Sequence, residues 1–177
     1  MKIFIVNGFP ESGKTTFEDY CKEKLIQGPH RNKVYYFSTI TNVKRLAEEI
    51  GWDGKKTPKD RKFLSDLKDL LTEYNDYPYH SVKKEIQKII TKTGGKTKDY
   101  IFFIDCREPQ EIKKIAKDLR AETICIRRPE VESIIQSNHA DSEILSIDYD
   151  YYIWNKGTLK DFENNIDIFI NEVIEGE

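Results

Sequence analysis

The chain has 177 residues, 38% of them hydrophobic and 34% charged, and this length suits one domain with its own buried core. The formal net charge of −2 and the sequence pI of about 6.0 argue against a protein that binds nucleic acid or a membrane surface. No apolar stretch approaches the roughly 20 residues that span a bilayer, and no secretory signal is visible, so we expect a cytoplasmic protein.

Short apolar runs alternate with amphipathic stretches along the chain, which is typical of a parallel sheet covered by helices. The predicted strands are residues 2–7, 33–38, 100–104, 123–127 and 151–154. Four of them are nearly continuously hydrophobic, as expected for strands that are buried on both faces. We therefore predict an α/β fold of three layers, in which a five-stranded parallel sheet is flanked by helices.

A phosphate-binding motif follows the first predicted strand. Residues 8–15 read Gly-Phe-Pro-Glu-Ser-Gly-Lys-Thr, which fits G-x-x-x-x-G-K-[ST], and a helical pattern follows. Glycines let backbone N–H groups form a concave anion nest, and the helix points its positive end at the phosphates. The Lys14 amine is placed to reach the β- and γ-phosphates, and the Thr15 hydroxyl to bind Mg²⁺. We predict a nucleoside triphosphate site rather than a ligand-free turn, with Gly8, Ser12, Gly13, Lys14 and Thr15 as its residues.

Residues 39–99 lie between the second and third predicted strands and are mainly helical, which is far longer than a simple crossover. Thr57 and Pro58 read as the cap and the first residue of one helix. Its apolar face is expected to hold Phe63, Leu64, Leu67, Leu70, Leu71 and Tyr74, and its outward face Lys62, Asp66, Lys68, Asp69 and Glu73. We predict that this segment is a helical substrate-binding insertion.

Candidate acceptor-binding residues lie in the insertion. They are Thr39 at its start and the cations Lys44, Arg45 and Arg61, because an arginine offers a bidentate fork to a phosphate. The alternative for Lys44 and Arg45 is a solvated helix face. The aromatic residues either stack on a base or, as we favour, pack in the core; they are Trp52, Tyr74, Tyr77 and Tyr79.

Two polar residues follow the third predicted strand. Asp105 ends this apolar run, so its carboxylate should emerge at the edge where open α/β sheets bind ligands. There it is a candidate for holding Mg²⁺ or orienting the attacking group, the alternative being a plain helix cap. Arg107 is a candidate for neutralising a transferring phosphoryl group. A helix is expected to begin at Pro109.

Residues 127–150 form a second, shorter excursion that we interpret as a lid. A closing lid would bring Arg127 or Arg128 onto the phosphates, the alternative being surface charge on a loop. His139 lies in this excursion and has no metal-ligating companions. A final helix is predicted to begin after Thr158, with an apolar face of Leu159, Phe162, Ile166, Phe169, Ile170 and Val173.

Four segments together resemble the P-loop nucleoside monophosphate kinases, most of all the phage-type deoxynucleoside monophosphate kinases. They are residues 8–16, residues 43–61, the Asp-x-Arg segment 104–111, and residues 126–129 with His139 and Glu143. Residues 149–159 end in Asn-Lys-Gly-Thr-Leu and also resemble the close of dephospho-coenzyme A kinases. The resemblance implies a P-loop kinase fold, ATP and Mg²⁺ as donor, and a (deoxy)nucleoside monophosphate as acceptor.

The resemblance also implies roles for single residues. Asp105 would be an acid of the catalytic site and Arg107 a phosphate ligand, while Asn155 and Gly157 would lie near the adenine. Two departures stand out. Glu11 replaces the glycine usual in adenylate kinases, and Lys-Thr-Thr replaces their Lys-Gly-Thr, so Thr15 and Thr16 are both candidates for the threonine near the metal.

The hypothesis is one kinase domain over residues 1–177 that transfers a phosphoryl group from MgATP to a small phosphorylated acceptor. Its expected catalytic residues are Lys14, Asp105, Arg107 and Arg128; Arg127 is expected to bind ATP, and Thr39, Lys44, Arg61 and Arg107 the acceptor. Two rival hypotheses stay open. One is a related kinase with another acceptor, such as dephospho-coenzyme A, and the other is a nucleotide-binding regulatory protein. Whether the chain is a monomer or a homodimer is also open.

Overall fold

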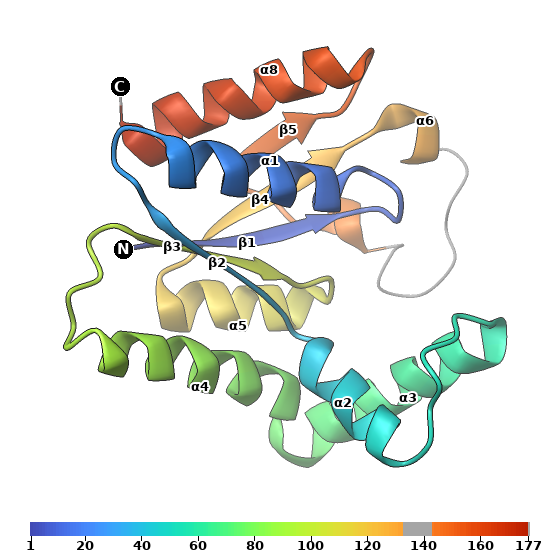
Figure 1. Cartoon of the computed structure of the whole chain (residues 1–177). Helices are drawn as coiled ribbons and strands as arrows, with labels where there is room; N and C mark the ends of the chain where they lie inside the picture. Colours follow the sequence, from blue (N-terminus) through green and yellow to red (C-terminus); the bar gives the residue numbers. More distant parts are fainter. Residues whose placement is uncertain (133–142, 177) are drawn as a thin grey trace. The chain divides into compact units, whose positions relative to one another are not determined.

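The computed structural model describes residues 1–132 and 143–176, and His139 lies outside them. The chain divides into two compact units (Figure 1). Unit 1 comprises Met1–Tyr36 and Lys98–Glu177, and unit 2 comprises Phe37–Thr97. The phosphate-binding motif belongs to unit 1, and most of the residues predicted as an insertion belong to unit 2.

A five-stranded sheet forms the centre of unit 1, in the order β2-β3-β1-β4-β5 (Figure 1). The strands are β1 (Lys2–Gly8), β2 (Lys33–Ser38), β3 (Tyr100–Asp105), β4 (Glu122–Arg127) and β5 (Tyr151–Trp154). All five predicted strands are confirmed. In the parallel register Val6 lies beside Asp105 of β3, and Gly8 lies beside Ile126 of β4. The end of β1 therefore lies between the ends of two neighbouring strands.

Burial differs between the central strands and the edge strands. β1, β3 and β4 are buried almost throughout, as their continuous hydrophobic runs predict. β2 and β5 lie at the two edges of the sheet and are partly exposed. The expectation of four strands buried on both faces is therefore wrong at the edges, because an edge strand lacks a neighbour on one side.

Helices cover both faces of the sheet in unit 1. α1 (Lys14–Gln27) and α8 (Leu159–Phe169) lie on one face, and α5 (Pro109–Leu119) lies on the other (Figure 1). α1 buries Phe17, Cys21 and Leu25, which recur every four residues and therefore share one side of the helix. Phe17 packs edge-on against Phe103 of β3, with ring centroids 5.7 Å apart. The short elements are α6 (Pro129–Glu132), η1 (Ile144–Ser146) and the π-helical η2 (Ile170–Glu175).

The start of α8 corrects one expectation. The Thr158 cap is confirmed, because the Thr158 hydroxyl accepts from the Asp161 amide while the Asp161 carboxylate accepts from the Thr158 amide. Phe162 and Ile166 are buried as predicted, but Leu159 is 61% exposed. Side chains tilt toward the N-terminus of a helix, so a residue in the first turn projects past its end instead of onto the sheet.

Unit 2 consists of α2 (Thr41–Glu49), α3 (Pro58–Asn75) and α4 (Tyr77–Lys92). The capping box at Thr57 and Asp60 is confirmed. The expected face of α3 is partly wrong: Lys68 is buried, whereas Leu70 and Tyr74 are 62% and 81% exposed. Both α2 and α4 pack on α3. Because the apolar stripe of α3 is broad, the placement of these two neighbours decides which side of α3 is buried. Lys68 lies on that side and donates from Nζ to Thr39 Oγ1 at 3.3 Å.

Candidate active site

The phosphate loop joins β1 to α1 and requires glycine at both ends. Gly8 has φ +149°, and a Cβ there would lie 2.6 Å from the Ile126 carbonyl oxygen and 2.7 Å from Ser12 Oγ. Gly13 has φ +104°, and a Cβ there would lie 2.6 Å from Asn155 Nδ2. Such contacts are too short for any side chain, so the spacing of these two glycines follows from the shape of the loop.

The N-terminus of α1 is suited to an anion. Its cap is Gly13 in the left-handed conformation, no side chain caps it in the described part of the chain, and its first turn carries no acid. By contrast, α3 and α8 each begin with a capping box that includes an aspartate. The first N–H groups of a helix lack intrahelical partners and carry partial positive charge. At α1 these groups are left for a ligand such as a phosphate.

Lys14 folds back onto the loop. Its Nζ donates to the carbonyl oxygens of Gly8 and Phe9 at 2.7 and 2.9 Å. The amine is therefore held against the backbone at the start of the loop.

Asn155, the residue after β5, is hydrogen-bonded to the phosphate loop at Ser12. Asn155 Nδ2 donates to the Ser12 carbonyl oxygen at 2.9 Å, and its backbone N–H donates to the Arg127 carbonyl oxygen at 2.8 Å. The Ser12 hydroxyl oxygen is buried and has no hydrogen-bond partner among residues 1–132 and 143–176. A buried polar atom of this kind is normally satisfied by a ligand or water, so the loop fits a phosphate group. The family resemblance implies that Asn155 lies near the adenine. In the structure its side chain contacts the backbone of the phosphate loop.

Gly157 and the two threonines after Lys14 complete the residues predicted to bind ATP. Gly157 has φ +89° and lies in the turn before α8, where a Cβ would approach Asp161 Oδ2 to 2.7 Å. Thr15 and Thr16 both lie in the first turn of α1 and are exposed. Both therefore stay candidates for the threonine near the metal.

Arg127 and Arg128 end β4 but have different partners. Arg127 donates from Nε and Nη2 to the Glu132 carboxylate at 2.7 and 2.6 Å, and its guanidinium lies 5.0 Å from the ring centroid of Trp154. Arg128 donates from Nη1 to the Glu11 carbonyl oxygen at 3.0 Å. Of the two predicted arginines, Arg128 touches the phosphate loop, whereas Arg127 is held in a bidentate ion pair.

Two carboxylates lie close enough to each other to interact, and one of them also interacts with the loop lysine. Asp105 ends β3 beside Val6 in the strand register, as predicted. Glu18, one turn after Lys14 on α1, was not predicted. Burial, together with the negative charge of Asp105, raises the pKa of Glu18 to about 7, against the opposing effect of Lys14. Only the fold brings Glu18 near Asp105, so no local pattern could have identified it. Together with the hydroxyl of Thr15 or Thr16, the two carboxylates offer oxygen ligands, which suit Mg²⁺.

Asn7, directly before the loop, is also a new site residue. It is fully buried; its Oδ1 accepts from the Gly8 N–H at 2.7 Å, and its Nδ2 donates to Tyr149 Oη at 2.7 Å and to the Arg107 carbonyl oxygen at 3.4 Å. A polar residue inside an apolar strand was the available sequence signal. Arg107 is half-buried and follows Asp105, so it lies beside the end of β1.

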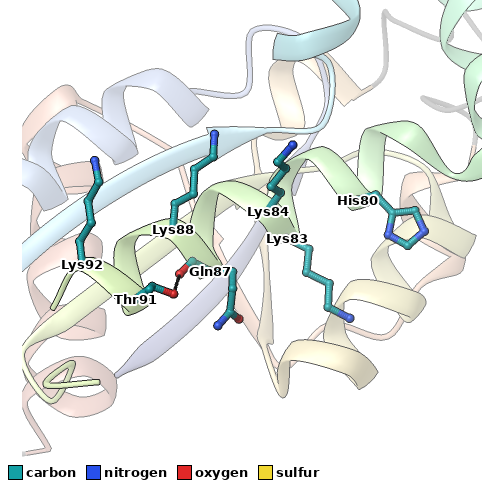
Figure 2. Close-up of a pocket in the computed structure, with 7 residues that line it drawn as sticks. All are labelled: His80, Lys83, Lys84, Gln87, Lys88, Thr91 and Lys92. Atoms are coloured by element: carbon teal, nitrogen blue, oxygen red, sulfur yellow. Dashed lines mark hydrogen bonds between the residues drawn. The ribbon is translucent and has the colours of Figure 1, made fainter. Parts of the chain in front are cut away.

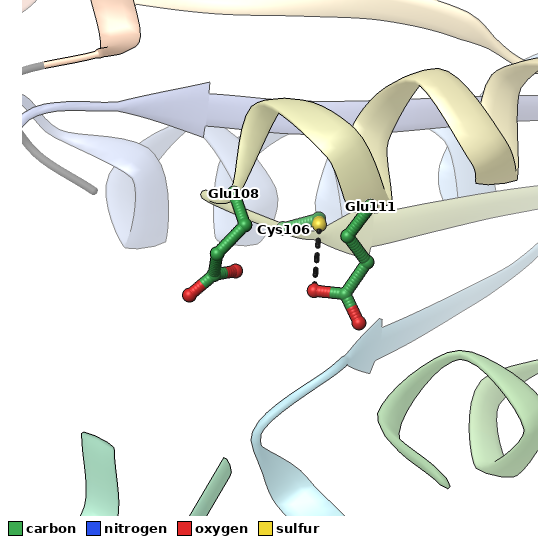
Figure 3. Close-up of side chains that lie close together, drawn as sticks. All are labelled: Cys106, Glu108 and Glu111. Atoms are coloured by element: carbon green, nitrogen blue, oxygen red, sulfur yellow. Dashed lines mark hydrogen bonds between the residues drawn. The ribbon is translucent and has the colours of Figure 1, made fainter. Parts of the chain in front are cut away.

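Cys106, Glu108 and Glu111 lie together at the start of α5 (Figure 3). Their ligating atoms lie within 4.8 Å of one another, and the Cys106 thiol donates to Glu111 Oε2 at 3.3 Å. The two glutamates occupy the cap and first turn of α5, where the helix dipole favours acids. The hydrogen bond and the dipole account for the cluster, so we assign no metal to it.

The other two thiols, Cys21 and Cys125, are buried. Burial raises their pKa values, that of Cys125 to about 12.

The remaining predicted acceptor residues belong to unit 2. Thr39 is buried against Lys68, Lys44 is half-buried on α2, and Arg61 is exposed on α3. Among the aromatic candidates, Tyr79 is buried in unit 2 and Tyr74 is exposed. Unit 2 also has a surface hollow lined by α4 alone, with Lys84, Lys88 and Lys92 on one side and Lys83 and Gln87 on the other (Figure 2). Its lining residues include no carboxylate, and we give the hollow no part in the chemistry.

No helix in the described ranges is long and apolar enough to span a bilayer.

No family model matches the chain, and no curated protein sequence matches it. Solved structures do. A dephospho-CoA kinase from Campylobacter jejuni matches with a TM-score of 0.54 at 16% identity, over 97% of this chain and 96% of that one. A thymidylate kinase from Ehrlichia chaffeensis matches with a TM-score of 0.49 at 16% identity, over 98% of each chain. A shikimate kinase from Aquifex aeolicus matches with a TM-score of 0.49 at 12% identity, over the whole of both chains.

The sheet order, the loop between β1 and α1, and the match to the dephospho-CoA kinase define the fold of this chain as that of the P-loop kinases. The predicted fold class, a five-stranded parallel sheet flanked by helices, is confirmed. At 16% identity the match extends to the fold alone.

Proposed function

We propose that this protein is an ATP-dependent phosphotransferase whose acceptor is a (deoxy)nucleoside monophosphate. The observation that carries the proposal is the phosphate loop itself. It combines a helix N-terminus that no side chain caps in the described ranges, a Lys14 amine hydrogen-bonded to the loop backbone, and a buried Ser12 hydroxyl without a partner among the described residues. This set of donors suits the β- and γ-phosphates of a nucleoside triphosphate.

In the proposed reaction an anionic oxygen of the acceptor's phosphate attacks the γ-phosphorus. A new P–O bond forms, the bond from the γ-phosphorus to the β–γ bridging oxygen breaks, and ADP leaves. No general base is required, because the attacking oxygen carries no proton. Bound Mg²⁺ would neutralise charge on the β- and γ-phosphates.

The chain's own residues position these groups in the proposal. Loop amides and Lys14 hold the donor, while Thr15 or Thr16 and Asp105 provide oxygen ligands for the metal. Arg107, beside the end of β1, and Arg128, on the loop carbonyl of Glu11, supply positive charge to the transferring group. Arg127, Asn155 and Gly157 are proposed to lie toward the nucleoside of the donor, and Thr39, Lys44 and Arg61 toward the acceptor.

A second acceptor is supported by a specific observation. The matched fold includes a dephospho-CoA kinase, and residues 155–159 resemble the closing turn of that kinase group. Dephospho-coenzyme A offers a ribose hydroxyl instead of a phosphate oxygen. Its attack would require a base, for which Asp105 is the candidate.

The test is ADP release from MgATP in the presence of each common nucleoside monophosphate, and separately of dephospho-coenzyme A. Lys14→Ala is expected to lower kcat/KM by about a thousandfold. Lys22→Ala removes an exposed lysine from the same helix and is expected to change little. Unchanged phosphorylation of every acceptor by Lys14→Ala would refute the proposal. Acceptors can be ranked beforehand by their thermal stabilisation of the protein with MgADP.

A further inference from the structure

Three hydrogen bonds near the phosphate loop form a chain with a fixed direction. The Gly8 N–H donates to Asn7 Oδ1 at 2.7 Å, Asn7 Nδ2 donates to Tyr149 Oη at 2.7 Å, and Tyr149 Oη donates to the Ile144 carbonyl oxygen at 3.1 Å. A backbone N–H can only donate and a carbonyl can only accept, so both ends fix the direction of the whole chain. Asn7 is fully buried and Tyr149 is 7% exposed.

The same Asn7 carboxamide reaches the segment that carries Arg107. Its Nδ2 donates to the Arg107 carbonyl oxygen at 3.4 Å. The pairing of β1 with β3 ends at Val6 and Asp105, and one further backbone hydrogen bond joins the two segments, from the Cys106 N–H to the Val6 carbonyl oxygen at 3.2 Å. The Asn7 carboxamide adds a side-chain link one residue further on, between the first amide of the phosphate loop and the Arg107 carbonyl oxygen.

Gly8 is held on both sides while the loop has no ligand. Asn7 holds its N–H, and Lys14 Nζ holds its carbonyl oxygen at 2.7 Å. If Lys14 turns to a phosphate, its bond to Gly8 is lost. The hydrogen bond from the Gly8 N–H to Asn7 Oδ1 does not involve Lys14, so it remains and helps the pairing with β4 to hold Gly8.

We propose that Tyr149 is a positioning residue of the phosphotransfer site: it orients the Asn7 carboxamide, which sets the spacing between the phosphate loop and Arg107. The inference rests on the proposed function. Without the Tyr149 hydroxyl, Asn7 Nδ2 would lose its short hydrogen bond in a buried position, and on that side the carboxamide would keep the longer 3.4 Å contact with the Arg107 carbonyl oxygen. Burial raises the pKa of Tyr149, so the hydroxyl keeps its proton and its donor role at neutral pH.

The test compares Tyr149→Phe with Tyr151→Phe. The Tyr151 hydroxyl donates to Glu122 Oε1 at 2.8 Å, at the start of β4. Tyr149→Phe removes two buried hydrogen bonds and Tyr151→Phe one that is partly buried, so a purely structural role predicts a loss of stability in both variants and no change in binding in either. MgADP affinity is measured by calorimetry well below the unfolding temperature. Tyr149→Phe is expected to weaken it about tenfold and to lower kcat by a similar factor, whereas Tyr151→Phe stays within about twofold.

A double-mutant cycle checks the path of the effect. If Tyr149 acts through Asn7, adding Tyr149→Phe to Asn7→Ala lowers MgADP affinity no further. Additive effects of the two substitutions, or wild-type affinity and kcat in Tyr149→Phe, would overturn the inference. Wild-type protein that binds MgADP but phosphorylates no acceptor contradicts the proposed function instead, and the inference is then judged on MgADP binding alone.

A measurement on the wild-type protein decides the matter if the variants do not fold. The side-chain amide protons of Asn7 are expected to exchange with solvent at least a hundredfold more slowly than those of Asn165, which donates to an exposed carbonyl. Added MgADP is expected to shift the Asn7 resonances. Exchange as fast as that of Asn165, or no shift at saturating MgADP, would contradict the proposed role.

Discussion

Arg128 donates from Nη1 to the carbonyl oxygen of Glu11 at 3.0 Å and so joins the end of β4 to the middle of the phosphate loop. Glu11 itself has φ +62°, a left-handed conformation that favours glycine. Its side chain is exposed, so the carboxylate points to solvent and the loop uses the backbone of this residue. The acid that departs from the usual loop sequence is thus accommodated at the cost of backbone strain.

Glu11→Gly is expected to stabilise the protein by about 0.5–1 kcal/mol, because glycine removes the strain of a positive φ. It also removes a negative charge beside the proposed phosphate site, so MgATP affinity should rise about two- to fivefold at low salt. Urea unfolding and calorimetry measure the two effects. Glu11→Ala separates them, since it removes the charge and keeps the strain; equal stabilisation by alanine and glycine would show that strain is not the cause.

Arg128→Ala is expected to lower kcat for phosphoryl transfer by at least tenfold, with a smaller change in the KM for ATP, because its charge is proposed to act on the transferring group. The measurement is steady-state ADP release with the best acceptor. Arg31→Ala removes an exposed arginine from unit 1 and serves as the control. Equal losses in the two variants would indicate a general effect of charge and not a role for Arg128.

Glu132→Ala is expected to destabilise the protein by about 2 kcal/mol, because it leaves the partly buried Arg127 guanidinium without its bidentate partner. The hydrogen bonds from Arg127 lower the pKa of Glu132 below its ordinary value of 4.5. The stabilising contribution is therefore present above that value and is lost as pH falls through the lowered pKa. Chemical unfolding at neutral and acid pH should show the difference between variant and wild type shrinking in acid. Glu130→Ala, exposed on the same helix, should show no such trend.

Glu18→Gln is expected to change the pH dependence of stability in the absence of nucleotide and Mg²⁺. The pKa of Glu18 is raised from 4.5 to about 7 in the folded state, so the folded protein binds the proton more tightly than the unfolded chain. Stability from this group is complete below pH 4.5 and falls as pH rises to about 7, above which the full cost remains. The glutamine variant should be more stable than wild type by about 1 kcal/mol near pH 8, after allowance for solvent screening, and similar near pH 4.

Thermal or urea unfolding from about pH 4 to pH 8.5 tests this prediction. Glu23→Gln, an exposed substitution on the same helix, is the matched control. A constant difference between Glu18→Gln and wild type over this range would mean that Glu18 does not titrate there.

The sequence by itself determined the features that depend on neighbouring residues. Gly8 and Gly13 had to be glycines for the loop to turn, and the capping boxes at Thr57 and Thr158 were readable because each involves residues three positions apart. The central strands were predictable because strands buried on both faces have continuous apolar runs.

Only the tertiary structure decided which distant groups meet. It buried Lys68 and exposed Tyr74 on one helix, joined Arg128 to Glu11 and brought Glu18 near Asp105. These outcomes depend on packing between elements and on the desolvation it causes, and neither is encoded in local spacing.

The link from Asn7 to Tyr149 is the clearest case, because its two residues are 142 positions apart in the chain. A lone polar residue in an apolar strand indicates that some partner must exist, since a buried amide has to be hydrogen-bonded. Which partner it finds is decided by the order of the strands, which places the residues after η1 beside the end of β1.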